Sequence, residues 1–106
     1  MALVDARGYA DAARWMQERH YHPEAVSGTA QVAYLVGARP VLPPSTPQEA
    51  LDQIRQYRVG CFVYDERDVA SLPAMVHMLE ACEFLDPPVR IAGSPGRLGV
   101  WAQFVR

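Results

Sequence analysis

Two short polar segments have the residue types expected of a binding site at the rim of an α/β sheet. The first segment lies at the end of a predicted strand and consists of Ser27, Gly28 and Thr29. The second follows a strongly apolar predicted strand and consists of Asp65, Glu66, Arg67 and Asp68. Ligands of open α/β sheets bind beyond the carboxyl ends of the strands, so both segments share one rim if the strands are parallel neighbours. Hydroxyls, backbone amides and a loop of mixed charge could hold a sugar or a phosphate there. The alternative is that Ser27 and Thr29 cap a short helix and that the charged residues are ordinary surface.

No residues form a recognisable catalytic or metal-binding set. Asp65 and Glu66 are adjacent in an extended segment and diverge, so they do not make the facing carboxylate pair of a glycosidase. Cys61 has no histidine partner at a recognisable spacing for a thiol nucleophile. His20 and His22 are two ligands without a third, and a helix-end histidine near terminal carbonyls is the better interpretation. The sequence therefore predicts no catalytic residue, no metal and no cofactor.

Helices and strands alternate along the segments that must position these residues. Thr46 and Glu49 have capping-box spacing and Pro47 suits the first helical position, so a helix is expected over 47–59, with Gly60 ending it. The apolar run CFVY at 61–64 predicts a strand covered on both faces. Other helices are expected at 6–19, capped by Asp5, and at 30–37 and 72–82. Other strands are expected at 25–28, 39–42, 89–93 and 98–105.

This order predicts an α/β three-layer sandwich, with a mostly parallel sheet of four or five strands and helices on its faces. The last two strands surround the turn SPGR at 94–97 and predict a C-terminal β-hairpin. Pro43 and Pro44 limit the strand at 39–42 to an edge. A chain of 106 residues without repeats or linkers is expected to form one domain, residues 1–106.

Composition excludes several classes of protein. Half of the residues are hydrophobic, which is enough for a core, and the net charge of -2 comes from interspersed charges. Neither a nucleic-acid footprint nor a polyanionic tail is present, so no nucleic-acid partner is expected. Cys61 and Cys82 are expected to be buried free thiols. No apolar run approaches the roughly 20 residues that span a bilayer, so the chain is expected to be soluble.

Three strings carry a resemblance to a known family: AARWM at 12–16, AYLVGAR at 33–39 and IRQYRVGCFVYD at 54–65. In their order and spacing they resemble the soluble C-terminal extracytoplasmic domain of membrane glycosyltransferases that use polyprenyl-phosphate sugars, the protein mannosyltransferase and aminoarabinose transferase type. The resemblance extends over about residues 9–105. Each string is mostly a packing pattern, and the weight lies in their order.

The resemblance implies a domain excised from a larger membrane protein and placed on its extracytoplasmic face, periplasmic or extracellular. There it would support acceptor recognition or cover the active site, without catalysing alone. Its partners would be the transmembrane part of the parent protein and an acceptor glycan or protein. The family's catalytic acid lies between membrane helices, so no catalytic residue is carried over to this chain. The alternative is a free-standing cytoplasmic binding or interaction module, homodimeric through the edge strand near Val41.

Overall fold

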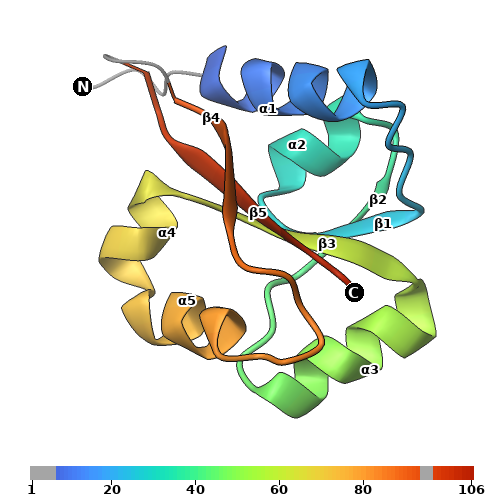
Figure 1. The fold of residues 1–106 in the computed structure, drawn as a ribbon, viewed down its shortest axis with the longest axis vertical. Helices are drawn as coiled ribbons and strands as arrows, with labels where there is room; N and C mark the ends of the chain where they lie inside the picture. Colours follow the sequence, from blue (N-terminus) through green and yellow to red (C-terminus); the bar gives the residue numbers. More distant parts are fainter. Residues whose placement is uncertain (1–6, 94–96) are drawn as a thin grey trace.

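The computed structural model describes residues 7–93 and 97–106, whose helices and strands alternate along most of the chain (Figure 1). In chain order they are α1 (Arg7–Glu18), β1 (Ala25–Gly28), α2 (Ala30–Leu35), β2 (Arg39–Val41), α3 (Pro47–Tyr57), β3 (Val59–Asp65), α4 (Glu66–Ser71), α5 (Pro73–Glu80), β4 (Val89–Ala92) and β5 (Val100–Phe104). This order agrees with the sequence prediction except at α4, which was expected to be a charged loop. The expected cap Asp5 and most of the turn at 94–97 lie outside the described residues.

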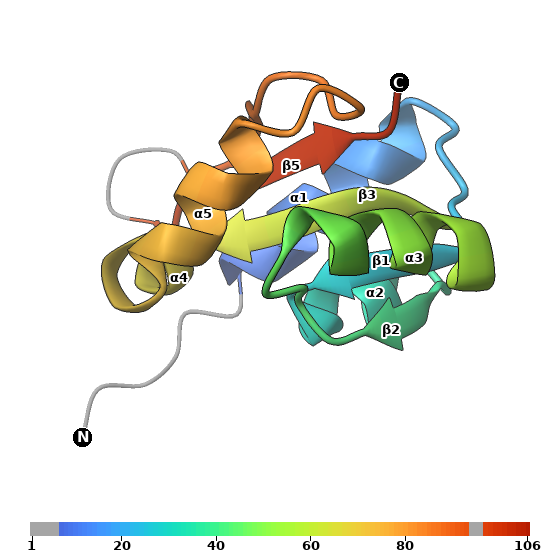
Figure 2. The ribbon, with the colours of Figure 1, turned by 90° about the horizontal axis from the view of Figure 1, so that it is seen from below.

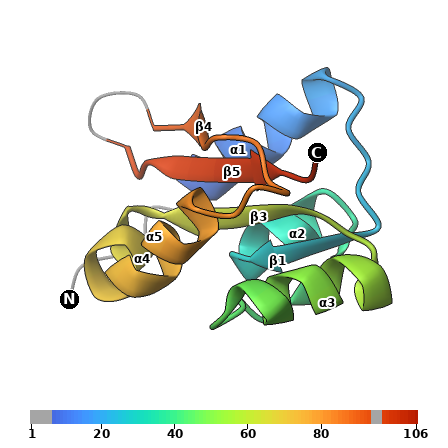
Figure 3. The same ribbon diagram turned by 60° about the horizontal axis from the view of Figure 1, so that its bottom comes forward.

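Within the described residues, the strands form one mixed sheet in the order β2-β1-β3-β5-β4. Figure 3 labels four of these strands, β1, β3, β5 and β4. β1 pairs in parallel with β2 and β3, whereas β5 pairs antiparallel with β3 and β4. The prediction of a mostly parallel sheet is therefore wrong, and the predicted C-terminal strand pair is confirmed. Both results have one cause. The helical crossover returns the chain to β4 in the direction of β3, and β5 then inserts between them, antiparallel to both.

Apolar side chains of the sheet are buried on both of its faces. α1 and α2 cover the face that contains Cys61 and Val63, whereas α3 and α5 cover the face that contains Phe62 and Tyr64 (Figures 1 and 2). From Cys61 to Tyr64, successive side chains of β3 thus alternate between two cores, as the period of two in a strand requires. This confirms the interpretation of the CFVY run as a strand covered on both sides.

The helix before β3 starts as predicted but ends earlier. Thr46 is the N-cap of α3, and the helix ends at Tyr57, with Arg58 in the left-handed region at φ 57°. The expectation that Gly60 ends the helix is therefore wrong, because Gly60 lies inside β3. A Cβ added at Gly60 would lie 2.5 Å from the Tyr21 hydroxyl oxygen. The glycine serves close packing against that ring rather than a turn.

Candidate functional site at the ends of β1 and β3

The carboxyl ends of β1 and β3 lie side by side, as a shared rim requires. Their parallel register places Ser27 beside Phe62 and Gly28 beside Val63. The helix after β1, α2, packs on the same face as α1, whereas α5, which comes after β3, packs on the opposite face (Figure 1). Parallel neighbours whose connections leave toward opposite faces open a crevice at their carboxyl ends, where open α/β sheets bind ligands.

A pocket of about 190 Å³ occupies this position, and we refer to it as the crevice. Its lining comes from α1, the start of α2, the loop after β2, the ends of β1 and β3, and α4 and α5: Tyr9, Gly28, Thr29, Ala30, Gln31, Pro43, Val63, Asp65, Asp68 and Met75. Two of these side chains are carboxylic acids and none is an arginine. The crevice is therefore electronegative and disfavours anions.

Asp65 organises the polar side of the crevice. Its side chain is buried, and Oδ1 accepts hydrogen bonds from the backbone N–H groups of Arg67 at 2.8 Å and Asp68 at 3.0 Å. The Asp68 carboxylate in turn accepts from the Asp65 N–H at 3.0 Å, which completes a capping box for α4. The predicted loop is a helix because the sequence DERD supplies both halves of that box. Tyr9 donates its hydroxyl to Asp65 Oδ2 at 2.7 Å.

Two groups in the crevice have shifted pKa values. Burial, followed by the hydrogen bond to Asp65, raises the pKa of Tyr9 to about 12. Burial also raises the pKa of the Asp68 carboxyl, and the backbone hydrogen bond from Asp65 opposes that rise. Removal from water disfavours the charged form of both groups. A phenol held in its protonated form is a hydrogen-bond donor, not a base.

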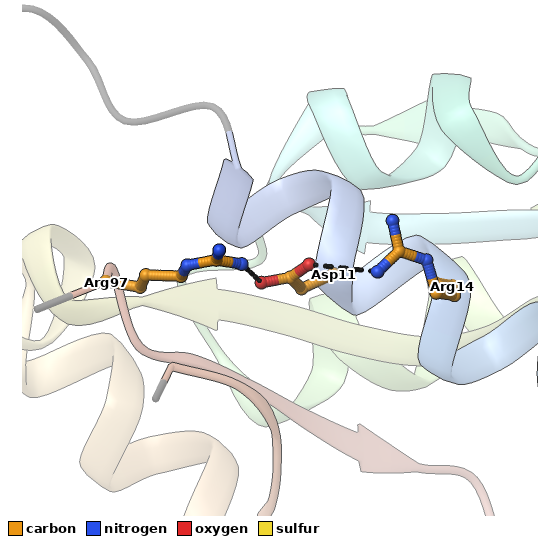
Figure 4. Close-up of polar contacts among 3 residues, drawn as sticks. All are labelled: Asp11, Arg14 and Arg97. Atoms are coloured by element: carbon orange, nitrogen blue, oxygen red, sulfur yellow. Dashed lines mark hydrogen bonds and ion pairs between the residues drawn. The ribbon is translucent and has the colours of Figure 1, made fainter. Parts of the chain in front are cut away.

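Contacts near its start hold α1 over the crevice. Arg97, which precedes β5, donates to the Asp11 carboxylate at 2.7 Å, and Arg14 approaches the other oxygen of Asp11 at 3.5 Å (Figure 4). The Asp11 side chain is 23% exposed, so its pair with Arg97 is partly shielded from solvent. This pair links α1 to the segment before β5 and helps to keep Tyr9 above Asp65.

Gly28 and Thr29 line the crevice at the end of β1. Gly28 has φ 109°, and an added Cβ would overlap the carbonyl oxygen of Val63. The backbone N–H and the hydroxyl of Thr29 both donate to that same oxygen, at 3.1 Å and 3.4 Å. Thr29 is the N-cap residue of α2 but makes no side-chain cap hydrogen bond. Its hydroxyl therefore joins β1 to β3 instead of capping the helix.

The other predicted site residues, Ser27, Glu66 and Arg67, do not line the crevice. Ser27 is fully buried, and its hydroxyl lies 2.7 Å from Oε1 of Gln53 on α3. Glu66 turns toward the approach to β5, where Oε1 accepts from the Gly99 N–H at 2.7 Å. Arg67 gives its backbone N–H to the α4 cap, and its side chain is exposed. The structure thus brings Gly28, Thr29 and Asp65 together and separates the remaining three.

Sequence reasoning missed Tyr9, Gln31 and Met75 as lining residues. Tyr9 belongs to the apolar stripe of α1 and is buried there. Its hydroxyl nevertheless reaches Asp65, a residue 56 positions later in the chain. The available signal was the polar tip of a tyrosine within an otherwise apolar stripe, since such a tip needs a partner when buried. Nothing in the sequence pointed to Gln31 or Met75.

Among the described residues, the cysteines and histidines outside the crevice form no second reactive or metal-binding site. Cys61 and Cys82 are buried, as predicted, and free. Burial raises the pKa of the Cys61 thiol to about 12 and raises that of Cys82, so neither is an activated nucleophile. Across residues 7–93 and 97–106, no histidines, cysteines and acids gather in a group that could hold a metal ion. In the same ranges, no helix combines the length and apolar character needed to cross a bilayer.

No protein-family model, no curated protein and no solved structure matches this chain. Function therefore has to be argued from the site itself, since a fold of this class hosts many activities. The crevice offers hydroxyl, carboxylate, amide and apolar surfaces within one small volume, without an activated nucleophile. That combination is suited to binding and orienting a small polar group.

Proposed function

We propose that this chain is a three-layer α/β domain on the extracytoplasmic face of a polyprenyl-phosphate-sugar-dependent membrane glycosyltransferase, where it recognises the acceptor and does not catalyse alone. The observation that carries the proposal is the crevice between β1 and β3, with acidic and hydroxyl groups at a topological switch point. The resemblance of the strings at 12–16, 33–39 and 54–65 to that family's C-terminal domain supports the assignment of the parent enzyme.

The crevice favours binding over catalysis, because its polar groups already form hydrogen bonds within the protein. Both oxygens of Asp65 accept hydrogen bonds from the protein, and Tyr9 is held protonated by a pKa of about 12. A general base needs a pKa near the working pH and an oxygen free to take the proton. Neither group meets both conditions. The crevice therefore holds these two groups in fixed positions and does not free them for proton transfer.

A single neutral sugar ring is the ligand that this crevice suits best. Its volume of about 190 Å³ is below the roughly 300 Å³ at which pockets for drug-sized ligands begin, so one ring or one terminal residue fits. The Asp68 carboxylate can accept hydrogen bonds from sugar hydroxyls, and Met75 and Pro43 offer apolar surface to a ring face. The two acids and the absence of lining arginines work against a sugar phosphate.

An NMR titration of the chain with neutral monosaccharides and with the corresponding sugar 1-phosphates tests the proposed ligand. Neutral sugars should shift the backbone amide signals of Gly28, Thr29, Gln31 and Asp68, while the phosphates leave them unchanged. Asp68→Asn should weaken the binding several-fold, because an amide oxygen is a poorer acceptor for hydroxyls than a carboxylate. Asp52→Asn, on the exposed side of α3, is the matched control and should bind like the wild type.

Two results would contradict the proposal at different levels. Amide shifts that are absent from the crevice, or equally large with phosphates, would refute sugar recognition there. The parent enzyme is tested separately by the coding sequence upstream of Met1, which should continue into several apolar segments about 20 residues long. A natural start at Met1, without such segments, would instead favour a free-standing binding module.

A further inference from the structure

A second concave surface lies along the free edge of the sheet, away from the crevice. It is a groove of about 530 Å³ between β2 and α3, and it shares no lining residue with the crevice: Arg39, Pro40, Val41, Leu42, Gln53 and Tyr57. Leu42 is 84% exposed and Tyr57 is 38% exposed, so large apolar side chains face solvent here. Exposed apolar side chains that cluster around a groove are typical of interaction sites.

The exposed Leu42 stands on backbone that the core holds in place. Its carbonyl oxygen accepts from Gln53 Nε2 at 2.8 Å and lies 3.2 Å from the Ser27 hydroxyl, which also contacts Gln53 Oε1 at 2.7 Å. Ser27 is fully buried. Pro43 and Pro44 then restrict the chain that follows. A leucine displayed on fixed backbone loses little conformational entropy when a partner binds, which is what an interface anchor requires.

One end of this groove is basic. A neighbouring pocket of about 340 Å³ continues it past Arg39 and Tyr57, which line both, to Glu24, Gln56 and Arg58. Arg58 approaches Glu24 at 3.3 Å, and both of these side chains are well exposed. Arg39 forms no ion pair with any described residue. The surface therefore combines an apolar half with a half whose net charge is positive.

The edge of the sheet at this groove is poorly suited to adding a strand. The N–H of Arg39 donates to the carbonyl of Glu24 beside β1, so the next residue, Pro40, occupies the position whose backbone faces outward. Proline has no N–H to offer there. A partner would therefore bind through side chains in the groove and not by extending the sheet.

We propose that the groove between β2 and α3 binds a peptide segment of a partner protein that carries an apolar side chain next to one or more carboxylates. The apolar side chain packs against Leu42, Val41 and Tyr57, and the carboxylates face Arg39 and Arg58. The charge of the groove selects this occupant, because basic side chains beside an apolar anchor complement an acidic and apolar segment. This surface is independent of the sugar site, so either proposal can fail alone.

Phage display of short random-sequence peptides tests this proposal. The whole wild-type chain is the bait, and peptides that also bind the Leu42→Ser variant are removed. The wild type should enrich sequences in which Leu, Ile, Met or Phe adjoins Asp or Glu. A synthetic version of the most enriched peptide is then measured by fluorescence anisotropy. Leu42→Ser should weaken its binding by about tenfold or more, the usual effect of losing a central apolar anchor. Arg39→Ala should weaken it by about threefold and reduce its salt dependence.

Leu72→Ser is the matched control, because Leu72 is 45% exposed and does not line the groove. It should bind the peptide as tightly as the wild type does. The proposal is overturned if no sequence is enriched by the wild type over Leu42→Ser, or if the enriched peptides lack acids. It is also overturned if sedimentation shows a wild-type dimer that Leu42→Ser dissolves, since a second copy of the chain would then be the occupant.

Discussion

The crevice and the groove differ in what their side chains do for the fold. In the crevice, Asp65, Thr29 and Tyr9 are buried and hydrogen-bonded to other parts of the protein. In the groove, the side chains of Leu42 and Arg39 are exposed, and only their backbone is fixed, by hydrogen bonds to Gln53, Ser27 and Glu24. Changes to the crevice should therefore cost stability, whereas changes to the groove should leave stability nearly unaltered.

This difference shows two ways of preparing a surface for binding. The crevice is built from residues that also join β1, β3, α1 and α4, so its shape is fixed as tightly as the core. The groove presents Leu42 and Arg39, whose side chains are exposed, on a backbone that hydrogen bonds hold in place. A substitution in the crevice confounds stability with binding, and its test needs a stability measurement beside it.

Gly28→Ala should be the most damaging change. The added methyl group would overlap the Val63 carbonyl oxygen. The residue would also have to keep φ 109°, a backbone conformation that residues with a Cβ atom rarely adopt. Strain and overpacking together are expected to lower the free energy of unfolding by roughly 4 kcal/mol. Urea denaturation followed by circular dichroism measures this loss.

Gly37→Ala is the control for that comparison. Gly37 has φ 76°, but no atom lies within 4 Å of the position of an added Cβ. Its substitution should cost only about 1 kcal/mol, from the left-handed backbone alone. If the two variants lose similar stability, the close approach of β1 and β3 at the crevice is not the reason that position 28 requires a glycine.

Asp65→Ala should have the second-largest effect. It removes the N-cap of α4 and leaves the buried Tyr9 hydroxyl without its acceptor. Together these losses are expected to lower the free energy of unfolding by roughly 3 kcal/mol. Thr46→Ala removes only the cap of α3, so it should cost about 1 kcal/mol in the same denaturation experiment.

A groove variant tests the expected difference in stability between changes to the groove and changes to the crevice. Leu42→Ala should change stability by no more than about 0.5 kcal/mol, because its side chain is 84% exposed. Equal losses for Asp65→Ala and Thr46→Ala would mean that the Tyr9 hydrogen bond contributes nothing. A large loss for Leu42→Ala would mean that the groove is part of the core.

Local patterns in the sequence predicted most elements because each carries its own signal. Thr46 and Pro47 mark the start of α3, and the CFVY run marks a strand buried on both faces. The strand directions could not be predicted in the same way, because the position of β5 between β3 and β4 depends on long-range packing. The charged residues 65–68 suggest a loop by composition, although Asp65 and Asp68 have the spacing of the capping box that starts α4.

The candidate site was predicted in position but not in orientation. Gly28, Thr29 and Asp65 follow strands that proved to be parallel neighbours, so the rim itself was predictable. The direction of the Ser27 side chain depends on the pleat of β1, which a four-residue strand does not reveal. The contribution of Tyr9 depends on how α1 is docked, and helix docking leaves no local pattern.

Tyr9→Phe should have a smaller effect than either Gly28→Ala or Asp65→Ala, and a characteristic dependence on pH. Near neutral pH, loss of the hydrogen bond to Asp65 should cost about 1.5 kcal/mol. The pKa of Tyr9 is raised from 10.0 to about 12 in the folded protein, so the stabilisation is fully present below pH 10 and is lost as the pH rises to about 12. The difference in stability between wild type and variant should therefore narrow across that window. Tyr34→Phe, at a position that is 69% exposed, should show no such narrowing. A difference in stability that stays constant up to pH 12 would mean that folding does not raise the pKa of Tyr9. The Tyr9 hydroxyl would then be as accessible to solvent as the side chains of the groove.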